Sequence, residues 1–455
     1  MKKFLLFLGL LFCGLHFAAS AQTTTIKVFD TVLYFDGYAN RVDTPLPPPG
    51  VIRHRNDLYA RKLSTQELQS IGNTLTMNIT VKAACDNYDR IGNVNIAFVP
   101  KGDTTYSPDS VSRIEIGRYI TPFMNKNVSP KQVPYTYTMD NVAYLLRDAA
   151  LNAAYDIWVE LELFGVPYAA NTQVAGCAGR NDVFYGSLEF VTSGPTGSQD
   201  NNVLIPIAFK ESFNNYNANA TDTVGKTTRT FTFDVPENLT DASFFLITSN
   251  HGANSGGEEY IRRNHFVYYD GSLIHTYKPG RTSCEPFRQY NTQGNGIYGS
   301  SPKSDATWQS FSNWCPGDKI DIRVLNLGPV TAGTHKFMIN VPAATFAGGQ
   351  GNFPLSLYFQ GKTSGMLSTK DAQVTKSSFS VYPNPAQGAV TVEQKGNLSI
   401  KGIRVYDALG RNVFTNTQIN HPKFSFATTD YASGLYLIHI ETKEGTVIEK
   451  LQVIK

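Results

Sequence analysis

Short segments in which apolar and polar residues alternate recur along the chain, and this pattern constrains the fold more than any other feature. A period of two sends successive side chains to opposite faces of a β-strand. Seven such segments occur at 76–81, 93–99, 157–163, 203–209, 230–235, 265–269 and 336–341. Turn-forming clusters rich in Pro, Gly, Asn, Asp and Ser separate them, while long amphipathic helical patterns are scarce. An all-β chain of sandwich architecture is therefore predicted.

The 455-residue length predicts roughly two to four domains. Two polar stretches, 193–198 and 362–378, mark the expected boundaries. We predict one sandwich over 22–195, a second over 196–361, a linker over 362–378 and a separate small domain over 379–455.

Residues 1–21 have the pattern of a signal peptide. Lys2 and Lys3 precede an apolar stretch over 4–18, and Ala19-Ser20-Ala21 supplies the small residues that favour cleavage after Ala21. Cys13 follows a bulky phenylalanine, which argues against a lipoprotein cleavage site. No later apolar run is long enough to cross a bilayer, so no membrane span is expected after cleavage.

Four cysteines remain after this cleavage: Cys85, Cys177, Cys284 and Cys315. An even number in an oxidising compartment indicates two disulfides. Four cysteines allow three pairings, and their number alone leaves all three open.

Several functional classes lack their sequence signals. The formal net charge is +3 and no dense Lys/Arg stripe occurs, so no nucleic-acid partner is expected. The central histidines show neither His-x-His nor His-x-x-x-His spacing, which argues against a copper or zinc site. These histidines are His54, His251, His265, His275 and His335. Nucleophile-elbow and phosphate-loop motifs are also missing.

Acidic residues beside arginines and aromatic residues are the candidates for chemistry, because carboxylates transfer protons and aromatic faces hold sugars. They occur at 85–90, at Glu160 and within 251–265. In the last segment, strand alternation would send Glu259 and Arg263 to one face and Glu258 to the other. An exposed, salt-bridged strand entry would account for the same residues without catalysis.

The region from 24 to 361 resembles the peptide:N-glycosidase F family of amidases, which release N-linked glycans from glycoproteins. Five short motifs in the family's order carry the resemblance: Cys85-Asp86-Asn87-Tyr88-Asp89-Arg90, 115–122, the strand around Glu160, 251–265 and Trp314-Cys315-Pro316-Gly317. The resemblance implies two adjacent jelly-roll-like antiparallel β-sandwiches. It also implies hydrolysis of the bond between asparagine and the first N-acetylglucosamine, with N-glycosylated proteins or glycopeptides as partners and no cofactor.

The same resemblance implies catalytic roles. Asp89 matches the family's main catalytic carboxylate, with Arg90 as its neighbour. Glu259 and Glu160 match two further glutamates, although Glu258 becomes the match if the loop shifts by one residue. Substrate contacts are expected from Arg90, Arg263, Glu258, Tyr88, Tyr260 and Trp314.

The chain also departs from the family pattern. The resemblance pairs Cys284 with Cys315, which leaves Cys85 for Cys177, whereas the family's small disulfide before the aspartate is missing. Tyr88, Glu162 and Tyr260 replace tryptophans that face the sugar. We therefore expect the same reaction with a different glycan preference.

The segment 379–455 resembles the C-terminal sorting domain of the type IX secretion system. The resemblance is carried by 381–385, 405–411, Gly434-Leu435-Tyr436 and the final six residues. It implies a small β-sandwich, contact with the type IX machinery, and export through the periplasm and outer membrane to the surface or the medium. A carbohydrate-binding sandwich is the alternative for this segment.

Two other functions compete with the amidase. A non-catalytic glycan-binding surface protein would use the same cleft, with Asp89 and Glu259 contributing to affinity alone. A copper-dependent redox enzyme would contain bound metal after purification.

Overall fold

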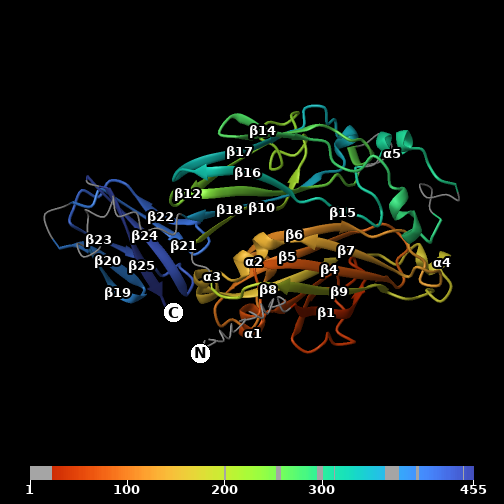
Figure 1. The fold of residues 1–455 in the computed structure, drawn as a ribbon, viewed down its shortest axis with the longest axis horizontal. Helices are drawn as coiled ribbons and strands as arrows, with labels where there is room; N and C mark the ends of the chain where they lie inside the picture. Colours follow the sequence, from red (N-terminus) through yellow and green to blue (C-terminus); the bar gives the residue numbers. More distant parts are fainter. Residues whose placement is uncertain are drawn as a thin grey trace, which may run out of the picture.

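The computed structural model describes residues 23–198, 201–252, 258–294, 301–311, 313–363, 379–395, 399–443 and 445–455. The predicted signal peptide, most of the predicted linker and the centre of the glycine-rich loop lie outside these residues. Three β-units follow one another along the chain, with the C-terminal unit at one end of the long axis (Figure 1).

Two antiparallel sheets form the first sandwich. The four-stranded sheet has the order β1 (Thr24–Phe35), β9 (Asp182–Ser193), β4 (Thr74–Ala83) and β7 (Gln132–Thr138). The six-stranded sheet has the order β15 (Lys319–Ile320), β6 (Ser112–Ile120), β5 (Ile91–Pro100), β8 (Tyr155–Leu163), β3 (Leu58–Lys62) and β2 (Val51–Arg55). Alternate residues of β4, such as Met77, Ile79 and Val81, are buried between the sheets, as the period of two requires.

Two four-stranded antiparallel sheets form the second sandwich. One has the order β10 (Asn202–Phe213), β18 (Phe353–Thr363), β12 (Leu239–Thr248) and β16 (Arg323–Val330). The other has the order β11 (Thr228–Val235), β17 (Gly333–Asn340), β13 (His265–Tyr269) and β14 (Ser272–Tyr277). Phe213, Phe244, Phe337 and Phe353 are fully buried in its core.

The C-terminal unit has a core of its own and strand order β22 (Asn412–Asn416), β21 (Gly402–Asp407), β24 (Gly434–Thr442), β25 (Gly445–Val453), β19 (Phe379–Gln387), β20 (Ala389–Gln394) and β23 (Lys423–Ala427). Strand β19 pairs with β20 near its start and with β25 near its end, so it joins two sheets. The arrangement is a small sandwich.

Helices are short and lie in connections. They are α1 (Thr65–Gln69), α2 (Asp140–Leu146), α3 (Ala149–Ala154), α4 (Ala170–Gln173) and α5 (Asp305–Phe311), with 3-10 turns η1 (Pro108–Ser110), η2 (Glu258–Tyr260), η3 (Glu285–Tyr290) and η5 (Ala347–Gly349). None of the helices in the described part of the chain has the length and apolar character that a bilayer crossing requires.

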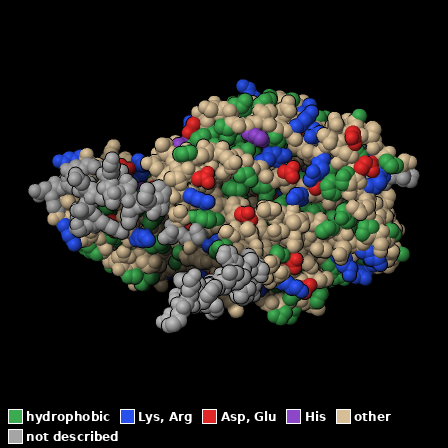
Figure 2. Space-filling model, in the orientation of Figure 1, with side chains coloured by type: hydrophobic (Ala, Val, Ile, Leu, Met, Phe, Trp, Pro, Cys, Tyr) green, Lys and Arg blue, Asp and Glu red, His purple; other side chains and the backbone are tan. Residues whose placement is uncertain are grey.

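The all-β prediction is confirmed. Each of the seven alternating segments coincides with a strand, namely β4, β5, β8, β10, β11, β13 and β17, although β17 ends one residue before the segment 336–341 does. On the face shown in Figure 2, cationic and anionic side chains are interspersed among tan and green atoms. This distribution agrees with the small net charge.

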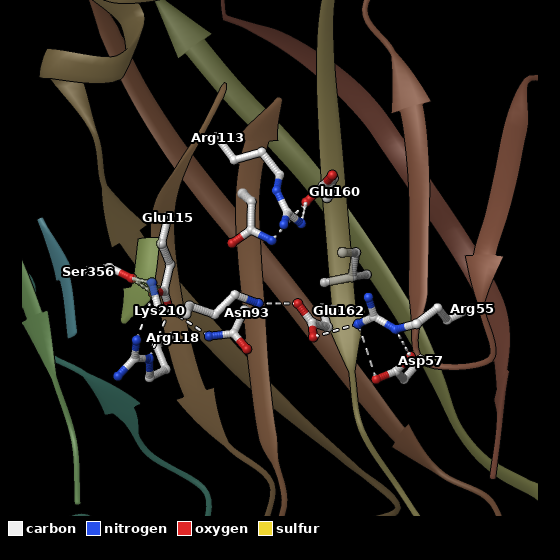
Figure 3. Close-up of polar contacts among 12 residues, drawn as sticks. Arg55, Asp57, Asn93, Arg113, Glu115, Arg118, Glu160, Glu162, Lys210 and Ser356 are labelled. Carbon is white, nitrogen blue, oxygen red and sulfur yellow. Dashed lines mark hydrogen bonds and ion pairs between the residues drawn. The ribbon is translucent and has the colours of Figure 1, made fainter. Parts of the chain in front are cut away.

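A polar layer joins the two sandwiches across the outer face of the six-stranded sheet (Figure 3). Arg118 is 1% exposed and pairs with Glu115 at 2.7 Å. Its guanidinium also donates to the Ser249 hydroxyl at 2.8 Å and to the Pro354 carbonyl at 2.7 Å, both in the second sandwich. Contacts of Ser356 with Glu115 and of Lys210 with Glu162 cross the same boundary. Charge pairs and hydrogen bonds therefore make up this part of the junction.

Candidate active site

The segment that carries Asp89 is a rigid connection into β5. Its first residue, Cys85, forms a disulfide with Cys177, 92 positions later. Asp86 is 1% exposed and accepts hydrogen bonds from the backbone N–H groups of Tyr88 at 2.9 Å and Val166 at 2.7 Å. It also pairs with Arg90 at 2.6 Å. These contacts replace the small local disulfide of the family pattern and leave Asp89 partly exposed.

A second turn, η2, presents Glu259 from the other sandwich. Asn313 is buried, and its side-chain amide lies 2.8 Å from each of the carbonyl oxygens of Glu258, Glu259 and Ile261. The Asn250 amide donates to the Glu258 carbonyl at 3.2 Å. The backbone on both sides of Glu259 is thereby fixed.

Glu258 and Glu259 have different surroundings. The Glu258 carboxylate is 1% exposed and receives two hydrogen bonds from Arg263, at 2.9 and 3.0 Å. It also accepts from the backbone N–H of Thr345 at 2.8 Å and from its hydroxyl at 3.1 Å. Glu259 is only partly buried. Glu258 and Arg263 therefore stabilise the turn, whereas the side chain of Glu259 remains partly exposed.

Asp89 and Glu259 interact electrostatically across the junction. Burial and, to a lesser extent, the charge of Glu259 together raise the pKa of Asp89 to about 7, against the opposing effect of Arg90. Burial also raises the pKa of Tyr260 to about 12, with additional contributions from the charges of Glu259 and Asp89. Two carboxylates and a phenol from separate sandwiches are therefore close enough to influence one another's pKa, which makes them the candidate site.

Aromatic packing bridges the two turns. The Tyr88 ring lies 5.7 Å from the Phe123 ring, edge to face, and 5.5 Å from the Arg90 guanidinium. Phe123 belongs to a buried cluster with Trp308 and the disulfide Cys284–Cys315. Cys315 stands two residues after Asn313, the residue that fixes η2. Tyr88 itself is 36% exposed and directly precedes Asp89 in the chain.

Glu160 lies apart from the pair. It is fully buried on β8, opposite Asn95 of β5, and contacts Asn95 at 3.0 Å, the Tyr106 hydroxyl at 2.8 Å and Arg113 at 3.5 Å (Figure 3). Asn95 is four residues beyond the start of β5, which corresponds to about 13 Å along the strand. The expectation that Glu160 shares a site with Asp89 and Glu259 does not fit this placement, because its carboxylate is enclosed among these partners.

Trp314 is a packing residue in the structure. Its side chain is 7% exposed, clusters with Ile120, Ile247 and Ile320, and donates its indole N–H to the Asn250 carbonyl at 2.8 Å. Its ring also stacks on His251, with centroids 5.9 Å apart. The predicted sugar-stacking role does not fit a ring enclosed in this way, whereas Tyr88 and Tyr260 border the carboxylate pair.

Cys284 pairs with Cys315, as the resemblance implies, and Cys85 pairs with Cys177, the pairing that this match leaves. Sequence reasoning did not assign a role to Asp86 or Asn313. Asp86 lies within the motif 85–90, four residues before Arg90, and this spacing of opposite charges could have indicated an ion pair. Nothing in the sequence distinguishes Asn313 from a surface asparagine.

Comparisons with known proteins agree with this architecture. The family models "Peptide-N-glycosidase F, N terminal" and "Peptide-N-glycosidase F, C terminal" match residues 25–178 and 215–360, and "Secretion system C-terminal sorting domain" matches 380–455. No curated protein matched the chain.

Solved structures give the same result at low identity. Two crystal forms of PNGF-II are each 21% identical over 75% of this chain, with TM-scores of 0.54 and 0.53. The chain covers 66% and 65% of those two structures. PNGase F, a glycosylasparaginase from Flavobacterium meningosepticum, is 14% identical over 75% of this chain and 96% of its own, with a TM-score of 0.48. The likeness to PNGF-II shows a shared fold.

Proposed function

The chain belongs to the peptide-N-glycosidase F family and carries a C-terminal sorting domain for export to the cell surface or the extracellular space, and on this basis we propose that it hydrolyses the amide between asparagine and the first N-acetylglucosamine of N-linked glycans. The observation that carries the proposal is the Asp89–Glu259 pair, in which one carboxyl has a pKa of about 7. A general base is most effective when its pKa lies near the working pH.

Water adds to the amide carbonyl in the proposed reaction. Asp89 removes a proton from the attacking water as its oxygen bonds to the carbonyl carbon. Arg90, fixed by Asp86, stabilises the negative charge that develops on the carbonyl oxygen. The carbon–nitrogen bond then breaks, and the proton passes through Glu259 to the departing glycosylamine nitrogen. The peptide product is aspartate.

The aromatic side chains at the rim define the substrate class. Tyr88 and Tyr260 provide faces on which a sugar ring can stack, and both lie beside the carboxylates. The proposed reaction assigns no step to Glu160, Arg263 or Glu258, because the side chain of each is engaged in buried polar contacts. Arg263 and Glu258 instead position the η2 turn.

Oligosaccharide release provides the direct test. Purified protein is incubated with a denatured N-glycoprotein, and the peptide is analysed by mass spectrometry. Free oligosaccharide together with conversion of asparagine to aspartate supports the amidase. Intact glycopeptide with several glycan types, from protein that is folded and binds those glycans, would favour the non-catalytic alternative.

The raised Asp89 pKa predicts the pH dependence. If the ionised form is the base, kcat/KM should fall about tenfold per pH unit below a midpoint near pH 7. Glu259→Gln removes a negative charge that raises this pKa, so the midpoint should move to lower pH. Residual kcat/KM measured between about pH 4 and pH 9 checks both statements. A wild-type midpoint near the ordinary value for aspartate would contradict them.

A matched pair of substitutions separates the two glutamates. Glu259→Gln should lower kcat by about 10²-fold or more with little change in stability. Glu258→Gln should lower the free energy of unfolding by about 2–3 kcal/mol, because Arg263 and Thr345 lose a buried ionic partner. Thermal unfolding and initial rates on both variants are the measurements. The opposite pattern would assign the catalytic role to Glu258.

A further inference from the structure

The turn that carries the motif 405–411 of the sorting domain faces the two sandwiches. Asp407 accepts backbone N–H bonds from Leu409 at 2.9 Å and Arg411 at 3.0 Å, and its carboxylate pairs with the Arg411 side chain at 2.7 Å. Gly410 closes the turn with a φ of +74°. The turn is therefore shaped by its own hydrogen bonds and projects Leu409 away from the sorting domain.

Leu409 is fully buried, although it does not belong to the core cluster of its own domain. It lies instead in the large cluster of the first sandwich, together with Leu204, Phe245 and Tyr358 from the second sandwich. Leucines at the tips of turns are often exposed. A leucine that is completely buried against another domain indicates that the two surfaces are complementary.

Neighbouring residues extend the contact to both sandwiches. A Cβ atom added to Gly410 would lie 3.5 Å from Ile205 and 4.0 Å from Pro236, so the turn approaches the second sandwich at backbone distance. A Cβ added to Gly434 would lie 3.9 Å from the Cβ of Ala154 at the end of α3. Figure 1 shows α3 beside β21 and β24 of the sorting domain. The contact therefore spans the seam between the sandwiches.

We propose that the turn 406–411 is a docking element whose partner is the seam formed by Ala154, Leu204 and Ile205 of the same chain. The sorting domain is thus held against its own cargo. A partner that binds the Leu409 side of this turn must first displace it from the seam, which couples recognition of the sorting domain to its release.

Disulfide trapping in the full chain tests this contact. The double variant Ala154→Cys/Gly434→Cys places two Cβ atoms about 4 Å apart, within the range that a disulfide requires. Ala153→Cys/Gly434→Cys is the matched control, because Ala153 is exposed on another side of the same helix. The loss of thiols that can be alkylated gives the rate of disulfide formation. Mass spectrometry of the linked peptides identifies which cysteines have paired.

Docking predicts trapping at least about tenfold faster for the Ala154 pair than for the control. Leu409→Asp should remove that difference, and Leu409→Ala should reduce it if the aspartate variant misfolds. Equal, slow trapping of both pairs would show a freely tethered domain and overturn the proposal. Fast trapping that neither Leu409 variant slows would overturn the role of the turn.

Discussion

Replacing Asp89 by asparagine should lower kcat/KM for amide hydrolysis by about 10²–10⁴-fold, because a positioned general base contributes a factor of this size. Asparagine keeps the shape of the side chain but cannot accept the water proton. The measurement is release of oligosaccharide, with mass spectrometry of the peptide. Asp43→Asn is the control, since its side chain is 82% exposed and pairs with Arg41 at the surface. Turnover within twofold of the wild type in Asp89→Asn would exclude Asp89 as the base.

The same substitution should stabilise the fold at neutral pH. Unfolded aspartate ionises near its ordinary pKa, whereas Asp89 in the folded chain ionises only near about 7. Folding between these two values takes up a proton, so stability decreases as pH rises toward 7 and stays low above it. Asp89→Asn should therefore raise the free energy of unfolding by about 1–3 kcal/mol at pH near 8 and by much less near pH 4. Chemical unfolding of the wild type and of Asp89→Asn at the two pH values measures this difference, and an equal change at both values would contradict the prediction.

Breaking the charged contact at the junction should have the largest effect on stability. Arg118→Met leaves Glu115 buried without its ion-pair partner, with Asn93 and Ser356 as its remaining polar partners. Removing one member of a buried ion pair typically lowers the free energy of unfolding by about 3–5 kcal/mol. We expect a loss of this size in chemical unfolding.

The double variant Glu115→Leu/Arg118→Met distinguishes charge from packing. With both charges removed, much of the lost stability should return, because the desolvation penalty of an unpaired carboxylate disappears. Equal destabilisation in the single and double variants would mean that the bonds from Arg118 to Ser249 and Pro354 dominate the effect instead.

Strand positions were predictable from the sequence because alternation is a local consequence of burial on one face. Met77, Ile79 and Val81 show this directly, since all three are buried while their neighbours are not. The likeness of short motifs to a family also singled out Asp89 and Glu259, the two carboxylates on which the proposed mechanism depends. Each lies in a turn whose position along the chain is tied to an adjacent strand or helix.

The tertiary contacts of individual side chains were less predictable from the sequence. Glu160 is polar and lies on a strand, but only the sheet register places Asn95 opposite it and thereby encloses its carboxylate. Trp314 has the residue type of a sugar platform, yet its side chain fills a gap between the two sandwiches. Asn313 orders the η2 backbone through carbonyl contacts more than 50 residues earlier in the chain, and these depend on the tertiary structure.

Strand β15 carries a consequence for any attempt to divide the protein. Its two residues come from the second half of the chain, yet they pair with Arg118 and Tyr119 at the margin of the first half's larger sheet. A fragment ending before residue 319 would leave β6 unpaired along that margin, and an unprotected strand of this kind recruits other chains. Such fragments should self-associate, so the smallest well-behaved fragment must include both halves.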